Sequence, residues 1–166
     1  MCGIVGYVGK QKAVPILMDG LKRLEYRGYD SAGIAVLENQ GLLFEKAAGK
    51  ISVLESMLNG KKFEATTGIA HTRWATHGEP TNQNAHPHID CKGEIAVVHN
   101  GIIENFDALK EVLARKGHKF ITQTDTEVLA HLIEEYFEGN LVEATRIALS
   151  LVEGTYGIAV LSQKTP

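Results

Sequence analysis

Hydrophobic residues recur along the chain with two different periods, and these periods separate predicted strands from predicted helices. The run Gly3–Val8 is short, apolar and rich in β-branched residues, which is typical of a strand. From Gln11 to Leu24 the apolar residues fall at helical spacing, and Pro15 is compatible with a helix because it lies in the first turn. The chain is therefore expected to begin with a strand and then a helix.

The same two periods continue through the rest of the sequence. Strands are expected over residues 32–37, 42–46, 67–71, 94–99 and 156–161, with a hairpin turn at 39–41. Helices are expected over residues 51–58, 106–116, 128–137 and 141–152. Asn105 is expected to cap the helix that ends at Gly117, and Thr124 to Glu127 has the pattern of a capping box for the next helix.

One long polar stretch, residues 73–90, follows neither period and contains Gly78, Pro80 and Pro87. A long irregular segment inside a compact domain is usually functional or disordered. The order of strands, hairpin and consecutive helices favours a layered α+β fold over a doubly wound parallel sheet. The chain ends at residues 162–166, directly after the last expected strand, which suggests a piece cut from a larger protein.

Composition narrows the class of protein. The 166 residues include 17 Lys and Arg and 20 Asp and Glu, for a formal net charge of −3, and the basic residues do not cluster. We therefore expect no nucleic acid and no membrane as partners. The sequence has no secretory signal, so a cytoplasmic location is expected, and the two thiols, Cys2 and Cys91, should stay free there.

Cys2 carries the most chemical information. Initiator methionine is generally removed before a small residue, and Cys2 would then hold both a thiol and the terminal α-amine. Their ordinary pKa values, about 8.5 and about 7.7–8.0, suit proton transfer near neutrality. A nucleophile activated by its own terminal amine is an established catalytic device. A small buried residue on an edge strand remains the commoner explanation of these residues taken alone.

Two further motifs each have two explanations. Asn100-Gly101 is first a turn signal, but an amide side chain beside an unhindered Gly N–H could also stabilise an oxyanion. Arg73 has the shape to bind a carboxylate, and Trp74 could form a lid. Taken alone, the second motif is better explained by a surface ion pair and a packed aromatic ring.

Histidines are frequent in this region and raise the possibility of a metal site: His71, His77, His86, His88 and His99. Their spacing matches no recognised ligand pattern, so we expect no metal. Asp125 taken alone would be an exposed carboxylate at a helix N-terminus, where it caps the helix and complements the helix dipole.

Several motifs occur in one order along the chain: residues 2–6, 24–33, 71–80, 84–88, 99–105 and 124–127. In this order they resemble the glutamine-dependent amidotransferases of the N-terminal-nucleophile type, over essentially the whole chain. The resemblance implies a four-layer αββα N-terminal-nucleophile hydrolase fold. Residues 1–166 would then form an incomplete class II glutamine amidotransferase, or glutaminase, domain.

The resemblance also implies roles for individual residues. Cys2 would be the nucleophile, with its α-amine as the general base. Asn100 and Gly101 would form the oxyanion hole. Arg73 would hold the α-carboxylate of L-glutamine, and Asp125 would hold its α-ammonium group.

Four more residues would complete the site. Trp74, Thr76 and His77 would lie in a loop that closes over the substrate, and Arg27 would support the nucleophile. Hydrolysis of glutamine by this route needs no metal and no cofactor.

The sequences of residues 26–30 and 72–78 resemble those of the amidotransferases that transfer ammonia to fructose 6-phosphate in amino-sugar biosynthesis. They are less similar to the amidotransferases with other acceptors. Fructose 6-phosphate would bind to sugar-phosphate isomerase domains that these residues do not include, and the full enzyme would be a homodimer. A different acceptor, a catalytically silent interaction module of the same fold, and a histidine-based metal-binding protein are the alternatives.

Overall fold

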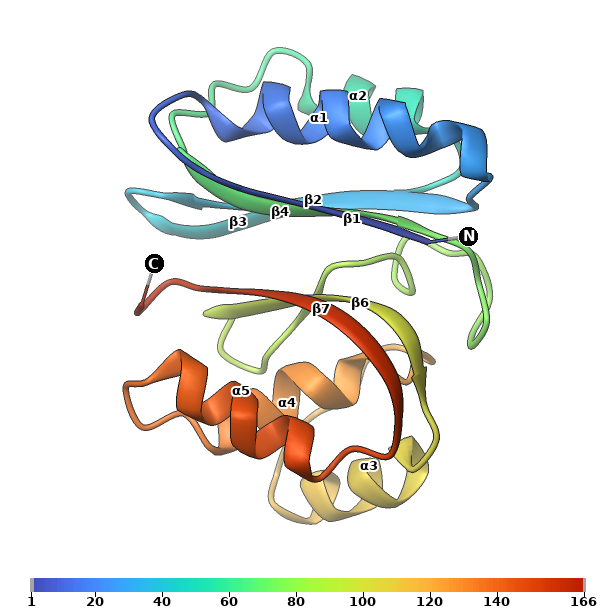
Figure 1. The fold of residues 1–166 in the computed structure, drawn as a ribbon, viewed down its shortest axis with the longest axis vertical. Coiled ribbons are helices and arrows are strands. Elements are labelled where there is room, and N and C mark those ends of the chain that lie inside the picture. Colours follow the sequence, from blue (N-terminus) through green and yellow to red (C-terminus); the bar gives the residue numbers. More distant parts are fainter. Residues whose placement is uncertain (1, 166) are drawn as a thin grey trace.

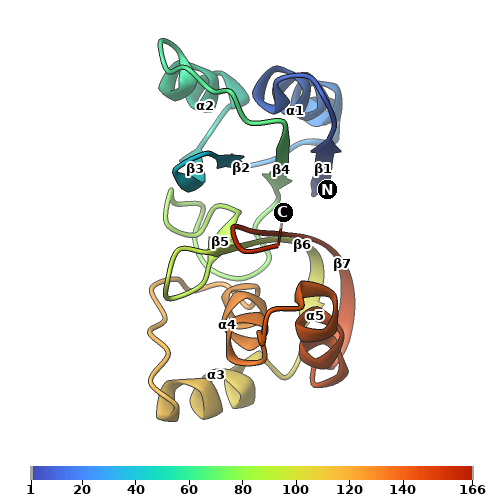
Figure 2. The ribbon, with the colours of Figure 1, turned by 90° about the vertical axis from the view of Figure 1, so that its left-hand side faces the viewer.

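The computed structural model describes residues 2–165, and its elements stack in four layers (Figure 1). Helices cover the outer side of one sheet, a second sheet faces the first, and further helices cover the outer side of the second sheet (Figures 1 and 2). The expected four-layer αββα arrangement is therefore confirmed. Within residues 2–165, no helix combines the length and the apolar character that crossing a bilayer requires.

The first sheet has four antiparallel strands in the order β1-β4-β2-β3. Its strands are β1 (Gly3–Val8), β2 (Ser31–Glu38), β3 (Gly41–Ala48) and β4 (Thr67–Arg73), and its helices are α1 (Ala13–Leu24) and α2 (Ile51–Leu58). A short 3-10 helix, η1 (Glu25–Arg27), follows α1. Leu17, Leu21 and Leu54 are fully buried between the helices and the sheet, so the helical spacing of apolar residues creates this core.

The second sheet has three antiparallel strands in the order β5-β6-β7. Its strands are β5 (His88–Ile89), β6 (Ile95–Ile103) and β7 (Gly154–Ser162), and its helices are α3 (Phe106–Arg115), α4 (Glu127–Glu135) and α5 (Leu141–Ser150). A third apolar cluster joins the two sheets through small and aliphatic side chains, including Ala35, Ala96 and Val98. Small residues here let the sheets approach closely.

The half-buried side chain of Lys46 orders the irregular segment between β4 and β5. The Lys46 ammonium donates hydrogen bonds to the carbonyls of Gln83, Ala85 and Pro87 at 2.9, 3.0 and 3.2 Å. Burial lowers the pKa of this lysine to about 8. The segment is thus part of the folded structure rather than a disordered loop.

Helices α3 and α4 begin within one residue of the expected positions, but the two side-chain capping bonds predicted there were wrong. The Asn105 side chain makes no capping bond to α3; its amide instead donates to the Leu151 carbonyl at 2.9 Å and accepts from Glu153 N at 3.0 Å. No capping box forms at α4, because the Glu127 carboxylate accepts hydrogen bonds from the N–H groups of Ile121 and Thr122. Asn105 thus binds a segment far along the chain, whereas Glu127 binds the loop five and six residues before it.

Candidate functional site

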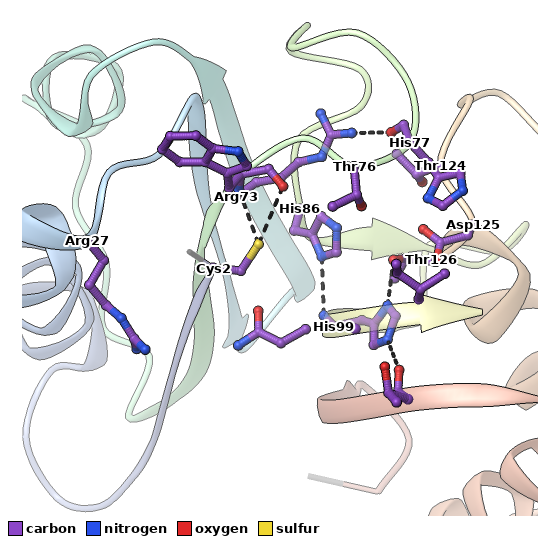
Figure 3. A pocket seen from close by; sticks show the side chains of 15 residues that line it. Cys2, Arg27, Arg73, Thr76, His77, His86, His99, Thr124, Asp125 and Thr126 are labelled. Carbon is purple, nitrogen blue, oxygen red and sulfur yellow. Dashed lines mark hydrogen bonds between the residues drawn. The ribbon is translucent and has the colours of Figure 1, made fainter. Parts of the chain in front are cut away.

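A cavity of about 650 Å³ opens at the end of the sandwich where β1 begins and β4 ends (Figure 3). Residues from both sheets line it, together with the segment just before α4. All of the site residues expected from the sequence are among its lining residues: Cys2, Arg27, Arg73, Trp74, Thr76, His77, Asn100, Gly101 and Asp125. Residues that are up to 123 positions apart in the sequence therefore share one cavity.

Cys2 enters the cavity because β1 pairs antiparallel with β4. In this register Gly3 lies opposite Thr72, so Cys2 lies beside the end of β4. Its Sγ accepts a hydrogen bond from Trp74 N at 3.1 Å and donates to the Trp74 carbonyl at 3.6 Å. Met1 lies outside the described residues, so the expectation that its removal frees the α-amine of Cys2 stays a prediction.

The Arg73 side chain is 4% exposed and carries a buried positive charge. Its guanidinium donates to the backbone carbonyls of His77, Gly78 and Glu79, the last two at 3.1 and 3.3 Å. The nearest carboxylate that forms an ion pair with it among residues 2–165 is Asp30, at 4.0 Å. Carbonyl dipoles neutralise a cation only in part, so this site favours an anionic ligand.

Asp30 is a site residue to which the sequence analysis assigned no role. Its backbone N–H donates to the Arg73 carbonyl at 2.7 Å, and its carboxylate accepts from Ala75 N and from the Ser31 hydroxyl. Asp30 therefore fixes the backbone where β4 ends and also faces the Arg73 guanidinium. Its position within the motif at residues 24–33 was the available signal.

Asp125 provides a buried negative charge on the other side of the cavity. Asp125 is only 4% exposed, so the expectation of an exposed carboxylate was wrong, and one carboxylate oxygen accepts a hydrogen bond from Ile103 N at 2.8 Å. This bond ties the segment before α4 to the end of β6. The cavity thus presents one buried cation, Arg73, and one buried anion, Asp125, which suits a zwitterionic ligand.

Asn100 is held by His71 on the neighbouring sheet. The Oδ1 atom of Asn100 lies 2.8 Å from Nε2 of His71, which is fully buried. Burial lowers the pKa of His71 to about 4, so the ring is neutral near pH 7 and donates this hydrogen bond. The Asn100 amide group keeps its own N–H donors for a ligand in the cavity.

Gly101 continues β6 instead of turning the chain. Asn100 and Gly101 pair with Gly157 and Tyr156 of β7, so the turn explanation of Asn-Gly was wrong. Gly101 has φ of +142°, and a Cβ atom there would lie 1.9 Å from the Thr155 carbonyl oxygen. Only glycine fits this close approach.

The loop residues differ in how firmly they are held. Trp74 is 54% exposed and lies over Gly28, where an added Cβ atom would come within 2.7 Å of the indole ring. His77 packs edge-on against Phe106, with ring centroids 5.4 Å apart. Thr76 is exposed at the rim of the cavity, and Arg27, at the end of η1, lines the side where Cys2 lies (Figure 3).

Four histidines form a buried group at the cavity, and two of them, His86 and His99, line it. His71 and His86 are stacked with ring centroids 4.1 Å apart, and His86 Nδ1 accepts from His99 N at 3.2 Å. His99 and His88 contact the hydroxyls of Thr126 and Thr124, each at 2.9 Å. Burial lowers the pKa of all four rings, so they act as neutral hydrogen-bonding groups that order the site.

Comparison with known proteins agrees with this geometry. The model of a family described as "Glutamine amidotransferase domain" matches residues 57–165. Glutamine–fructose-6-phosphate aminotransferases (isomerizing) from Clostridium tetani and Aquifex aeolicus are 55% and 56% identical over the whole chain, which spans 27% and 28% of their lengths. A solved glutamine phosphoribosylpyrophosphate amidotransferase from B. subtilis, complexed with ADP and GMP, superposes with a TM-score of 0.81 and 32% identity, over 98% of this chain and 35% of that one.

Proposed function

Because the chain belongs to the glutamine amidotransferase domain family, we propose that it hydrolyses L-glutamine to glutamate and ammonia through a thioester on Cys2. The observation that supports this most directly is the single cavity lined by a thiol, two oxyanion donors, a buried cation and a buried anion. Each group matches one part of glutamine. The cavity, of about 650 Å³, is also large enough to hold one glutamine molecule.

Substrate binding follows from the two buried charges. Glutamine is a zwitterion at its α-carbon, so Arg73 binds the carboxylate and Asp125 binds the ammonium group. The hydrogen bonds from Arg73 to the backbone of residues 77–79 link binding to the order of the loop that carries Thr76 and His77. With the α-carbon held at this end, the side-chain carboxamide extends toward Cys2.

The chemical step begins when the Cys2 thiol transfers its proton to the α-amine and the sulfur attacks the carboxamide carbon. A C–S bond forms, and the electron pair of the C=O bond moves to oxygen. The Asn100 amide and the Gly101 N–H donate to this oxyanion, and one such donor changes kcat by about 10²–10³-fold. The ammonium returns its proton to the leaving nitrogen, the C–N bond breaks, and ammonia departs.

Water then completes the cycle. It attacks the thioester carbon, the C–S bond breaks, and glutamate leaves while a proton returns to sulfur. Arg27 supports the negative charge near the nucleophile, and Trp74 covers the opening over Gly28. No step in this sequence requires a metal or a cofactor.

The acceptor of the ammonia is inferred from the relatives. The chain spans about a quarter of the length of the curated relatives it matches. We propose that it is the glutaminase domain of a longer, homodimeric, cytoplasmic enzyme that aminates fructose 6-phosphate for amino-sugar synthesis. An enzyme of this kind would bind the sugar phosphate outside residues 1–166.

Replacement of Cys2 with Ser and with Ala tests the proposal. Glutamate release from glutamine is measured for the purified protein and both variants, and thermal unfolding checks that each variant folds. We expect both variants to lose activity while they keep the unfolding temperature of the parent. Undiminished glutamate release by folded Cys2→Ala would reject the proposed nucleophile, and no release by the parent with a processed N-terminus would reject the proposed activity.

A further inference from the structure

A second group of reactive side chains lies outside the glutamine cavity. It contains Cys91 from the turn after β5, His118 from the segment after α3, and His131 and Glu134 from α4. One atom from each, namely Cys91 Sγ, a ring nitrogen of each histidine and a Glu134 oxygen, lies within 4.8 Å of all the others. None of the four residues lines the cavity that contains Cys2.

The separations between these atoms match those of ligands around a tetrahedral metal. Cys91 Sγ lies 3.7 Å from Nδ1 of His118 and 3.5 Å from Nδ1 of His131. Glu134 Oε2 lies 3.1 and 3.4 Å from the same two nitrogens. Zinc bonds of about 2.0–2.3 Å at tetrahedral angles place neighbouring ligand atoms roughly 3.3–3.7 Å apart.

Several polar atoms of this group converge on a single carboxylate oxygen. Both Nδ1 atoms and the Cys91 N–H, at 3.0 Å, approach the same oxygen, Glu134 Oε2. The side chains of His131, Glu134 and His118 are only 1%, 7% and 8% exposed, so water satisfies little of their polarity. A cation at the centre would give the sulfur, both nitrogens and the oxygen one common partner.

The outer nitrogens of the two rings face carboxylates. Nε2 of His118 lies 3.0 Å from Glu135 Oε2. Nε2 of His131 has no hydrogen-bond partner among the described residues, but Glu127 Oε1 lies 3.7 Å away. Histidines that bind metals through one nitrogen usually direct the other N–H at a carboxylate or a carbonyl. Both rings are therefore oriented to present Nδ1 to a metal.

We propose that Cys91, His118, His131 and Glu134 bind one structural zinc ion. Sulfur, nitrogen and oxygen ligands together suit Zn²⁺ better than Mg²⁺ or Ca²⁺, and four protein ligands leave no open position for catalysis. The charges balance, because a thiolate and a carboxylate offset the two charges of the ion. Zinc binding releases the thiol proton of Cys91 to solvent.

The ion would connect three segments that are far apart in sequence. The turn after β5, the segment between α3 and α4, and α4 itself meet at this group, in addition to the hydrogen bonds that Ile121 N and Thr122 N donate to Glu127. The segment between α3 and α4 lacks regular structure and leads to Asp125. Zinc therefore stabilises the part of the fold that supports one wall of the glutamine cavity, without touching the substrate.

Metal content is the first test. The protein is purified after growth with added zinc and is dialysed without chelator. Its metal content is then measured by inductively coupled plasma mass spectrometry. We expect about one zinc per chain, with at least a tenfold loss in Cys91→Ser and in His118→Asn. The matched controls Glu138→Gln, at an exposed carboxylate near α4, and Cys2→Ser, at the other thiol, keep the metal. Zinc below about one tenth per chain in the parent, or zinc retained in both ligand variants, would overturn the proposal.

Cobalt substitution gives a second test that does not depend on the folding of the ligand variants. Co²⁺ added to metal-free Cys2→Ser, whose only thiol is Cys91, should give a thiolate-to-cobalt charge-transfer band and the strong visible absorption of a tetrahedral ion. Adding zinc should abolish both features and raise the unfolding temperature. Absence of the charge-transfer band in this folded variant would contradict ligation by Cys91.

Discussion

Replacing Asn100 with Ala removes two interactions that come from opposite ends of one amide group. The Nδ2 end is the proposed oxyanion donor, and the Oδ1 end accepts the hydrogen bond of 2.8 Å from His71. Loss of the donor lowers kcat for glutamate release by about 10²–10³-fold. Loss of the acceptor leaves a buried imidazole N–H unsatisfied, which lowers the free energy of unfolding by about 1–3 kcal/mol.

Asn100→Asp separates these two effects. A carboxylate keeps an oxygen for His71, so this variant should retain most of the free energy of unfolding that Asn100→Ala loses. It has no N–H to donate, and its negative charge opposes the oxyanion, so kcat should fall at least as far as in Asn100→Ala. The charge also favours protonation of His71 and should raise the pKa of that ring above about 4.

Two measurements on the three proteins complete the comparison. Glutamate release at saturating glutamine gives kcat, and urea unfolding gives the free energy of unfolding. Parent-like kcat in Asn100→Asp would refute the oxyanion role. Equal destabilisation in both variants would refute the argument that His71 holds Asn100 through Oδ1.

Three further predictions follow from the buried groups. Arg73→Ala should raise KM for glutamine by roughly 10–100-fold with a smaller fall in kcat, because hydrogen bonds to charged groups contribute about 1.5–3 kcal/mol. A loss of kcat with unchanged KM in steady-state kinetics would contradict this prediction. Gly101→Ala should lower the free energy of unfolding in urea by at least about 1–3 kcal/mol, because its Cβ atom would lie 1.9 Å from the Thr155 carbonyl oxygen. Gly157→Ala is the control, because the nearest atom to a Cβ there is 4.0 Å away. Equal destabilisation by the two substitutions would contradict this prediction. The free energy of unfolding should fall as pH drops from 6.5 toward 4, because His71 binds a proton more readily in the unfolded chain. The lowering of the His71 pKa from 6.5 to about 4 corresponds to roughly 3 kcal/mol. A free energy of unfolding that does not change over this pH range would contradict the neutral buried ring.

The apolar periods predicted every main helix and strand, because burial of one face determines those elements. The predicted helix over residues 51–58 matches α2 at both ends, and the predicted strand Gly3–Val8 matches β1. The capping bonds of the helices were less predictable. Asn105 and Glu127 have side chains suited to capping, but Asn105 binds a backbone group 48 residues away and Glu127 binds the loop that precedes its helix.

The candidate site was predictable as a set of residues, and less so as a set of contacts. The ordered motifs identified the residues that line the cavity, but Asn100-Gly101 suggested a turn until the pairing of β6 with β7 was known. The supporting roles of Asp30 and His71 depend on contacts across the sheets. Cys91 and His118 are 27 positions apart, and only the packing of α4 brings them together with the i, i+3 pair His131 and Glu134.

Covalent trapping tests the central claim, a nucleophilic sulfur at Cys2, most directly. The purified protein is incubated with a glutamine analogue that carries a diazoketone in place of the carboxamide, and the adduct is located by peptide mass spectrometry. In protein treated with a chelator, Cys91 serves as the internal control, because it is the more exposed of the two thiols. The account predicts one adduct per chain, on Cys2, that excess glutamine prevents; an adduct on Cys91 or another side chain, with Cys2 unmodified, would contradict it.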